Sequence, residues 1–266
     1  MNIEQAARRV DDAARYASAI EQMGTSEAFQ VEDAYRIQRA SIALREARGE
    51  RTIGIKLGFT SRAKMIQMGV DSLIWGWLTD AMLEEEGAPV DLARFIHPRV
   101  EPEVCFLTKR DIDRPLTALE ALGHLEAVAP AMEIIDSRYQ AFRFTLEDVI
   151  ADNCSSAGLV VGAWSNRFDV LRNAGVLMRF DGRDVQVGST AAILGDPLRS
   201  IVQASRVTSE AEVVLPAGSL IMAGAATAAQ ALRRGLHVQC VVSGIGQAEF
   251  TTQHEGGHVN ETTRND

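Results

Sequence analysis

Cysteine is scarce in this sequence, and its few cysteines are far apart. The 266 residues include three, Cys105, Cys154 and Cys240, and no C-x-x-C pair occurs. This spacing predicts neither a disulfide framework nor a cysteine-ligated zinc site. The composition therefore suits a reducing, cytoplasmic location.

Basic residues and long apolar segments are scarce as well. The chain has 27 Lys and Arg against 36 Asp and Glu, a formal net charge of −9, and no basic block, so nucleic acid is not an expected partner. The N-terminus lacks the apolar core of a secretory signal. Residues 213–232 carry no charge, but they are mostly Ala, Gly, Ser and Thr and include Pro216, which argues against a membrane span. We therefore expect no membrane partner.

Hydrophobic periodicity divides the chain into a helical start and a β-rich remainder. Apolar residues recur every three to four positions within residues 1–50, and the second of two expected helices covers residues 31–47. Further along, alternating segments predict strands, and Asp181-Gly182 predicts a hairpin turn. The expected strands occupy residues 52–59, 98–107, 128–136, 158–164, 176–187 (as a hairpin), 219–223, 238–243 and 248–251, and further helices 61–68, with Thr60 as N-cap, 116–125 and 197–207.

The order of these segments bears on the fold class. Strands do not alternate regularly with long helices, which disfavours a doubly wound sheet. We expect an α+β protein with a helical N-terminal part over residues 1–50 and a β-rich catalytic domain over residues 51–256. Residues 257–266 are polar and are expected to form a frayed tail.

Two glutamates alternate with apolar residues in the strand expected over residues 98–107. Glu101 and Glu103 share one face, with Cα atoms about 6.5–7 Å apart. Two anions this close repel each other unless a cation lies between them. Pro102 cannot donate a hydrogen bond to a neighbouring strand, so we expect this strand at an edge, rim or bulge. The alternative is a solvated edge strand whose glutamates face water.

A third glutamate lies in an otherwise apolar segment. Glu133 follows residues 127–132, which are Ala, Val, Pro and Met only, and a carboxylate buried there needs a partner or a metal. Together with Glu101 and Glu103 it suggests a three-carboxylate site, and oxygen ligands suit Mg²⁺ or Mn²⁺. The alternative is a half-exposed strand with Glu133 on its wet face.

One lysine stands between two glycines in the strand expected over residues 52–59. Lys56 shares its face with Gly54 and Gly58, and glycines in a strand often mark the close approach of a ligand or of another backbone. Lys56 is therefore a candidate catalytic residue. A bend or bulge with an exposed lysine explains the pattern equally well.

Further polar residues follow Glu133. Arg138 and the small polar residues 151–156 suit a loop that lines a substrate site, although a plain turn is the default interpretation.

Two other motifs are rejected. The letters H-E-G-G-H at residues 254–258 match a zinc motif, but that motif needs a helix and the two glycines oppose helix formation. The glycines near Gly224 and Gly244 fit neither the dinucleotide-binding nor the P-loop pattern.

Several segments occur in the order found in a known family. They are K-L-G-F-T-S at 56–61, M-G-V-D at 68–71, the Glu101/Glu103 segment, E-I-I-D-S-R at 133–138, A-D-N at 151–153 and A-G-A-A-T at 223–227. The chain thereby resembles the hydratase/decarboxylase family of aromatic meta-cleavage pathways, within the fumarylacetoacetate hydrolase superfamily. The resemblance implies a mixed β-sandwich or β-roll domain, Mg²⁺ or Mn²⁺ held by Glu101, Glu103 and Glu133, and Lys56 as the active-site lysine.

The resemblance is stronger to the decarboxylase branch of this family. Hydratases carry an aspartate in a Q-P-D-F-G segment, whereas residues 72–76 here read S-L-I-W-G, with Ile74 at the aspartate position. The H-P-R-V-E-P-E and I-D-S-R-Y segments also resemble decarboxylases. The implied reaction is metal-dependent decarboxylation of 4-oxalocrotonate (2-oxo-3-hexenedioate) to 2-hydroxypenta-2,4-dienoate and CO₂.

This reaction suits the candidate residues. A metal chelated by a 2-oxo acid stabilises the dienolate left when CO₂ departs, whereas water addition needs a positioned acid and base, for which an aspartate at position 74 would serve. The substrate is a dicarboxylate dianion, and Lys56 and Arg138 are the expected cations. Lys56 either donates a proton to the dienolate or orients the 2-oxo group. Expected substrate contacts are Arg138, Ile74, Ser155 and Ser156.

Two alternatives remain at this stage. One is a 2-hydroxypenta-2,4-dienoate hydratase, against which Ile74 argues. The other is a metal-binding partner subunit of a hydratase complex, against which the intact Lys56 and the three glutamates argue. We also expect a homo-oligomer, and the resemblance implies a complex with a 2-hydroxypentadienoate hydratase.

Overall fold

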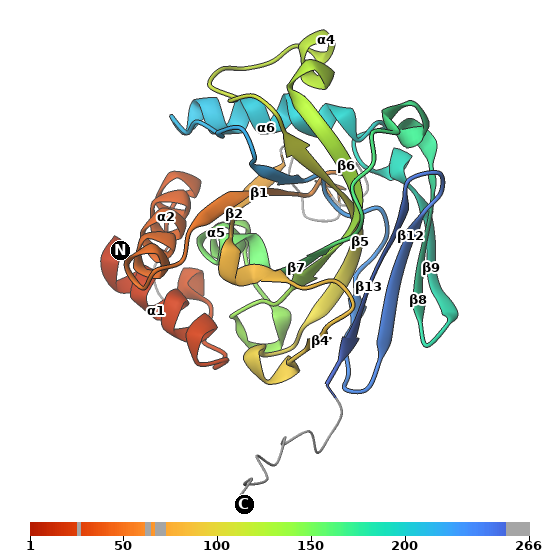
Figure 1. Ribbon diagram of the computed structural model, residues 1–266. Coiled ribbons are helices and arrows are strands. Elements are labelled where there is room, and N and C mark those ends of the chain that lie inside the picture. The colour runs from red at the N-terminus through yellow and green to blue at the C-terminus, as the bar shows by residue number, and fades with distance from the viewer. Residues whose placement is uncertain (26–27, 62–64, 67–72, 254–266) are drawn as a thin grey trace, which may run out of the picture.

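The computed structural model describes residues 1–25, 28–61, 65–66 and 73–253 (Figure 1). In these residues no helix is long and apolar enough to cross a membrane. The α-helices are α1 (Ile3–Arg15), α2 (Val31–Ala47), α4 (Ala118–Ala121), α5 (Leu146–Ala151) and α6 (Leu198–Glu210). The strands are β1 (Thr52–Gly58), β2 (Ile74–Thr79), β3 (Leu83–Glu84), β4 (Pro89–Val90), β5 (Arg99–Thr108), β6 (Leu125–Ile135), β7 (Ser156–Val161), β8 (Gly175–Phe180), β9 (Arg183–Ser189), β10 (Leu220–Met222), β11 (Gln230–Ala231), β12 (His237–Val242) and β13 (Gly246–Thr252).

Local sequence signals account for most of these elements. The helix expected over residues 31–47 is confirmed, and the hairpin turn is confirmed because Asp181 and Gly182 join β8 to β9 with positive φ of 51° and 77°. The helix expected over residues 116–125 is only one turn long, since Gly123 is a poor helix former and Leu125 already belongs to β6. Most of the helix expected over residues 61–68 lies outside the described residues.

Two mixed or antiparallel sheets form the body of the protein. The larger has the order β2-β1-β10-β5-β6-β7-β3, with β11 added beside β5, and the smaller has the order β4-β13-β12-β8-β9. The edge strands β2 and β3 of the larger sheet are joined by one short turn, Asp80–Met82, so this sheet must curl back on itself. Figure 1 shows the resulting roll, with the smaller sheet packed against its outside. The expected α+β class with a β-roll is therefore confirmed.

Alternation along β5 sends its side chains into two different environments. Val100, Val104 and Phe106 are fully buried in the core between the two sheets. The opposite face points into the roll, where Cys105 belongs to a small apolar cluster. Residues 99, 101 and 103 share that inner face, so the strand carries its charged side chains into the interior of the roll.

The expectation that this strand lies at an edge is wrong. β5 is an interior strand, because β6 pairs along one side and β10 and β11 pair along the other. Pro102 is tolerated because it falls in the gap between them: pairing with β10 ends at Cys105 and pairing with β11 begins at Val100. In that gap a loop approaches β5, and the Ala226 amide donates to the carbonyl of Pro102 (2.9 Å).

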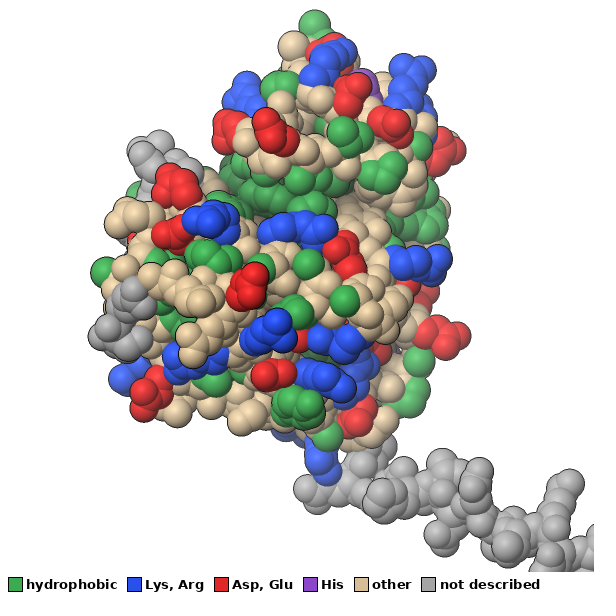
Figure 2. All heavy atoms as spheres, turned by 90° about the vertical axis from the view of Figure 1, so that its left-hand side faces the viewer, with side chains coloured by type: hydrophobic (Ala, Val, Ile, Leu, Met, Phe, Trp, Pro, Cys, Tyr) green, Lys and Arg blue, Asp and Glu red, His purple; other side chains and the backbone are tan. Residues whose placement is uncertain are grey.

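Helices α1 and α2 pack side by side against α5 and the β2 edge of the roll. The Gln38 amide on α2 donates to the carbonyls of Trp75 on β2 (3.0 Å) and Ile150 on α5 (2.9 Å). Figure 2 shows the face that carries these helices, on which acidic and basic side chains are interspersed. The division into domains at residue 50 stays a prediction, and the tail over residues 257–266 lies outside the described residues.

Candidate active site

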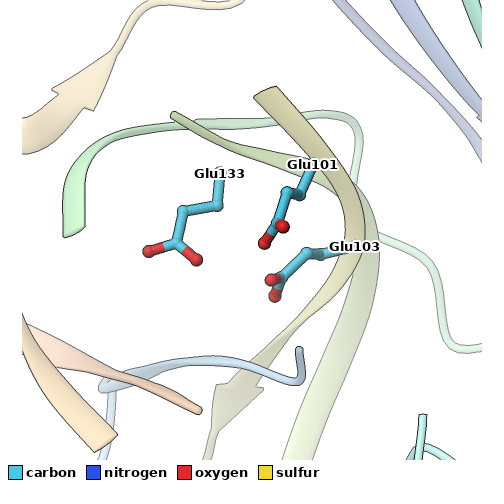
Figure 3. Close-up of side chains that lie close together, drawn as sticks. All are labelled: Glu101, Glu103 and Glu133. Atoms are coloured by element: carbon cyan, nitrogen blue, oxygen red, sulfur yellow. The ribbon is translucent and has the colours of Figure 1, made fainter. Parts of the chain in front are cut away.

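Three carboxylates converge inside the roll (Figure 3). Glu101 and Glu103 come from β5, and Glu133 comes from β6 directly opposite Glu101 in the register. One oxygen of each lies within 4.8 Å of the others. Glu103 and Glu133 are only 1% and 0% exposed, so the alternatives of water-facing glutamates on solvated or half-exposed strands are wrong for these two residues.

Among the described residues, Glu103 and Glu133 have fewer hydrogen-bond donors than buried carboxylates normally have. Within the described residues, Glu103 Oε1 and both oxygens of Glu133 make no hydrogen bond, although the Lys56 ammonium lies 3.0 Å from Glu133 Oε2 as an ion pair. The other oxygen of Glu103 accepts from the Gly224 amide (2.8 Å). Uncompensated buried oxygens are costly, and an all-oxygen set suits a hard divalent cation. The residues therefore fit a Mg²⁺ or Mn²⁺ ion.

The electrostatics agree with this fit. Burial raises the pKa of Glu103 well above its ordinary value, and the neighbouring Glu133 raises it further. Burial likewise raises the pKa of Glu133, while Lys56 opposes the increase. A divalent cation between the carboxylates would remove both the repulsion and part of the desolvation penalty.

Lys56 is held on β1 in the same interior. It is 4% exposed, and its ammonium donates to the carbonyl of Cys154 (3.1 Å). Burial alone would lower the pKa of Lys56, but the carboxylates, Glu133 foremost, raise it above the ordinary value. The lysine is therefore a cation at neutral pH.

The two glycines beside Lys56 have structural reasons. A Cβ on Gly54 would lie 1.9 Å from the carbonyl oxygen of Leu220 on β10, and one on Gly58 would lie 2.9 Å from Ile74 Cγ1 on β2. The register also shifts at Gly54, as a bulge would require. The bulge was therefore predicted correctly, but the exposed lysine that accompanied this alternative is wrong.

The carbonyl that meets Lys56 belongs to a strained turn rather than a plain one. Asn153, Cys154 and Ser155 have positive φ of 49°, 53° and 59° in succession, a conformation that costs free energy for residues other than glycine. The Asn153 side chain holds the turn against β2, accepting from the Trp77 amide (2.8 Å) and donating to its carbonyl (2.9 Å). The turn thereby directs the Cys154 carbonyl toward Lys56.

A cavity of about 860 Å³ opens beside this cluster. The Ser155 hydroxyl is buried there and makes no hydrogen bond among the described residues. Ile74 contributes an apolar wall and is 4% exposed. Other lining residues are Lys56, Arg99, Glu101 and Phe142.

Arg138 and Ser156 lie elsewhere. The Arg138 guanidinium forms an ion pair with Asp152 and donates to the carbonyls of Ser156 and Asp152, and it does not line this cavity. Ser156 is buried beside Glu133, whose pKa it helps to lower, and it is not a lining residue either. The geometry does not favour substrate contact by Arg138, because its guanidinium donates to Asp152 and to the carbonyl of Ser156. Its expected role in substrate binding stays a prediction.

Three functional features were missed in the sequence. Arg99 lines the cavity and shares the strand face of Glu101 and Glu103, a parity that could have revealed it. Gly224 supplies the amide that holds Glu103, and its φ of +108° and close approach to Thr60 require glycine. The Cys154 carbonyl had no sequence signal, because it depends on backbone conformation. The H-E-G-G-H segment lies outside the described residues.

Comparisons with known proteins agree with this geometry. Residues 53–253 match the fumarylacetoacetate (FAA) hydrolase C-terminal family. A 4-oxalocrotonate decarboxylase from a Pseudomonas species is 53% identical over 96% of this chain and 100% of its own length. A 2-hydroxyhexa-2,4-dienoate hydratase from Comamonas testosteroni is 34% identical over 81% of this chain and 84% of its own length.

A solved structure also matches closely. The 4-oxalocrotonate decarboxylase from Pseudomonas putida G7, complexed with magnesium and adipate, superposes with a TM-score of 0.91 at 33% identity, covering 94% of this chain and 97% of that one. The expected family is therefore confirmed by sequence and by structure. This chain belongs to the fumarylacetoacetate hydrolase family.

Proposed function

We propose that this chain catalyses the metal-dependent decarboxylation of 4-oxalocrotonate to 2-hydroxypenta-2,4-dienoate and CO₂. The observation that carries the proposal is the convergence of three carboxylates beside Lys56, where buried Glu103 and Glu133 have oxygens that accept no hydrogen bond within the described residues. The chain is also 53% identical to a 4-oxalocrotonate decarboxylase. The relatives named hydratases are less similar, at 34–38% identity.

Glu101, Glu103 and Glu133 would hold a divalent metal, Mg²⁺ or Mn²⁺. When bound, the ion supplies Lewis-acid stabilisation of negative charge on the 2-oxo oxygen of the substrate. The Gly224 amide fixes the carboxylate of Glu103, and Lys56 does the same for Glu133. These two contacts preorganise the site, because the ligands need not reorient when the ion arrives.

Lys56 is assigned to the oxygen on which charge develops. As the C5–C6 bond breaks, its electron pair moves through the C3–C4 double bond to the 2-oxo oxygen, and CO₂ departs. The buried ammonium donates a hydrogen bond to that oxygen and supplies the proton that converts the enolate to the enol. The carbonyl of Cys154 orients the ammonium during this step.

Ile74 favours decarboxylation over hydration. Loss of CO₂ needs no base, whereas water addition does, and Ile74 gives the cavity an apolar wall at the position of the hydratase aspartate. An apolar wall also favours the conversion of a carboxylate to neutral CO₂, because it does not solvate the anion. The buried Ser155 hydroxyl is the polar contact we assign to the substrate.

The test is CO₂ release from 4-oxalocrotonate with Mg²⁺, with and without EDTA. Release that depends on Mg²⁺ is the expected result. Water addition to 2-hydroxypenta-2,4-dienoate without CO₂ release would instead make the chain a hydratase. If Glu103→Gln abolished metal binding but left pathway flux intact, the chain would be a partner subunit.

We also infer that the protein is a homo-oligomer. Leu83 and Trp164 are 45% and 43% exposed, and with Leu107, Val161 and Leu220 they form the apolar part of a groove. Glu84, Glu85 and Glu86 also line this groove. Exposed apolar surface of this kind is typical of a protein contact, and a second copy is the proposed occupant. Light scattering of wild type and Leu83→Lys tests this, because the substitution should shift the mass toward the monomer. A monomeric wild type would contradict it.

A complex with a 2-hydroxypentadienoate hydratase remains a separate proposal. It rests on the chemistry, because the product of this reaction is a hydratase substrate and a reactive dienol. Co-elution of the two purified proteins would support it, and independent elution at micromolar concentrations would contradict it.

We place the protein in the cytoplasm. Its three cysteines are free and buried, as is usual for a reducing compartment. Cell fractionation tests the location, and recovery in a secreted or membrane fraction would contradict it.

A further inference from the structure

A second cation, besides Lys56, lies at the cavity that holds the carboxylates. Arg99 begins β5 on the same strand face as Glu101 and lines the cavity. Its side chain is exposed, and within the described residues no ion pair or hydrogen bond engages the guanidinium. The buried Arg138, by contrast, forms an ion pair with Asp152.

An aromatic ring fixes the position of this guanidinium. Arg99 lies over the ring of Phe142, 4.5 Å from its centroid, and Phe142 packs in turn against His97 and Phe144. Ala141 and Phe142 both have positive φ, 55° and 56°, so the short turn that carries Phe142 is held in an unfavourable conformation. A stacked guanidinium keeps its edge free for planar, two-point contact with a carboxylate.

The charge balance of the cavity calls for a second cation when a dicarboxylate binds. Three glutamates and a divalent ion leave one negative charge, which Lys56 neutralises. A dicarboxylate dianion would then enter the cavity with two uncompensated charges. Among the described lining residues, Arg99 is the cation besides Lys56, and it lies two residues before Glu101 on the same face of β5.

We propose that Arg99, held by Phe142, binds the distal carboxylate of the substrate and thereby selects dicarboxylates over monocarboxylates. This inference rests on the proposed function, because it names the group that recognises the carboxylate to be lost. It assigns to Arg99 the role that the sequence analysis gave to Arg138.

The chemistry sets the kinetic signature of this role. An arginine that pairs with the distal carboxylate stabilises the anion present before the reaction, whereas the CO₂ that leaves is neutral. The contact therefore aids binding more than it aids bond cleavage. Loss of Arg99 should raise KM about tenfold while leaving kcat unchanged or slightly higher.

The test compares two ligands that differ in one charge. Adipate and hexanoate are titrated calorimetrically into the Mg²⁺-loaded wild type, Arg99→Met, Phe142→Leu and the control Arg167→Met, which alters an exposed arginine paired with Asp169. We expect Arg99→Met to lose about tenfold in affinity for adipate and little for hexanoate. Phe142→Leu should show a smaller loss of the same kind, and Arg167→Met none.

Two results would overturn the proposal. Unchanged affinities for both ligands in Arg99→Met would show that Arg99 does not recognise the distal carboxylate. An equal loss for both ligands would make Arg99 a general attractor of anions rather than a specificity residue. Mg²⁺ titration of the same variant separates this from failure of the proposed function, because Arg99→Met should bind the ion as wild type does.

Discussion

Two cavities of the described structure are lined by charged residues, and the charges are arranged in opposite ways. In the active-site cavity, three like charges converge, and Glu103 Oε1 and both Glu133 oxygens accept no hydrogen bond among the described residues. The second cavity, of about 240 Å³, lies between the N-terminal helices and the roll and is lined by five arginines and three acids. There, opposite charges meet: Arg48 makes two hydrogen bonds to Asp11, of 2.6 and 2.7 Å.

This difference in charge pairing distinguishes the proposed active site from the part of the molecule that supports it. The paired charges of Asp11 and Arg48 hold α1 to the end of α2, whereas like charges gathered in one buried site cost stability unless a ligand compensates them. Arg138 connects the two regions, because it lines the second cavity while its partner Asp152 directly precedes the strained turn of the first. A substitution on the acidic side should therefore impair activity, and one on the arginine side should impair stability.

The largest effect is expected from Glu103→Gln. Loss of one carboxylate ligand should abolish Mg²⁺ binding and reduce CO₂ release by about 10³-fold, while the free energy of unfolding without metal changes little, because a repulsive charge is removed. Calorimetry with Mg²⁺ and urea unfolding measure the two quantities. Glu126→Gln on β6, an exposed position, is the matched control, and a loss of activity there would undermine the comparison.

Arg138→Gln should show the opposite pattern, with a pH dependence of defined sign. Burial raises the pKa of Asp152 to about 6, and Arg138 opposes the increase. Without the arginine the pKa rises further, so Asp152 is neutral at pH 5 but a buried, unpaired anion at pH 8. We expect a loss of about 3–5 kcal/mol at pH 8 and a clearly smaller loss at pH 5, measured by urea unfolding. Equal losses at both values would contradict the pairing.

Mg²⁺ should stabilise the wild type by binding to the three glutamates of the active-site cavity. Mg²⁺ at 100 times its Kd is expected to add about 2.7 kcal/mol to the free energy of unfolding. Thermal unfolding with and without the ion measures this, and Glu103→Gln should show no shift. An equal shift in that variant would place the ion somewhere else.

Asn153→Ala should cost less stability than Arg138→Gln and should also reduce activity. It removes two hydrogen bonds to Trp77 that hold the left-handed turn, at a cost of about 1–2 kcal/mol. The Cys154 carbonyl would then orient Lys56 less well, so kcat should fall while KM for Mg²⁺ stays constant. A loss of stability with unchanged kcat would show that the turn has only a structural role.

Features that depend on neighbouring residues in the sequence could be predicted, whereas features that depend on contacts between distant segments could not. Glu101, Glu103 and Lys56 were identified because alternation along one strand is a local property, and the structure brings all three together with Glu133. The edge placement of Pro102 was wrong because the neighbours of a strand are set by distant segments, here β10 and β11. The cavity that Arg138 lines could not be predicted for the same reason, since the path of residues 136–156 decides it.

Close packing of Gly58 against Ile74 has a consequence for how this site can diversify. The two residues are paired across β1 and β2, and a Cβ at position 58 would lie 2.9 Å from the isoleucine. Substitutions at the two positions should therefore be non-additive: the effect of a new residue at 74 depends on whether 58 is still glycine. Libraries that aim to redirect the enzyme from decarboxylation to hydration should vary positions 58 and 74 together. A change at only one of these positions would be tested against a neighbour that is packed for the original residue.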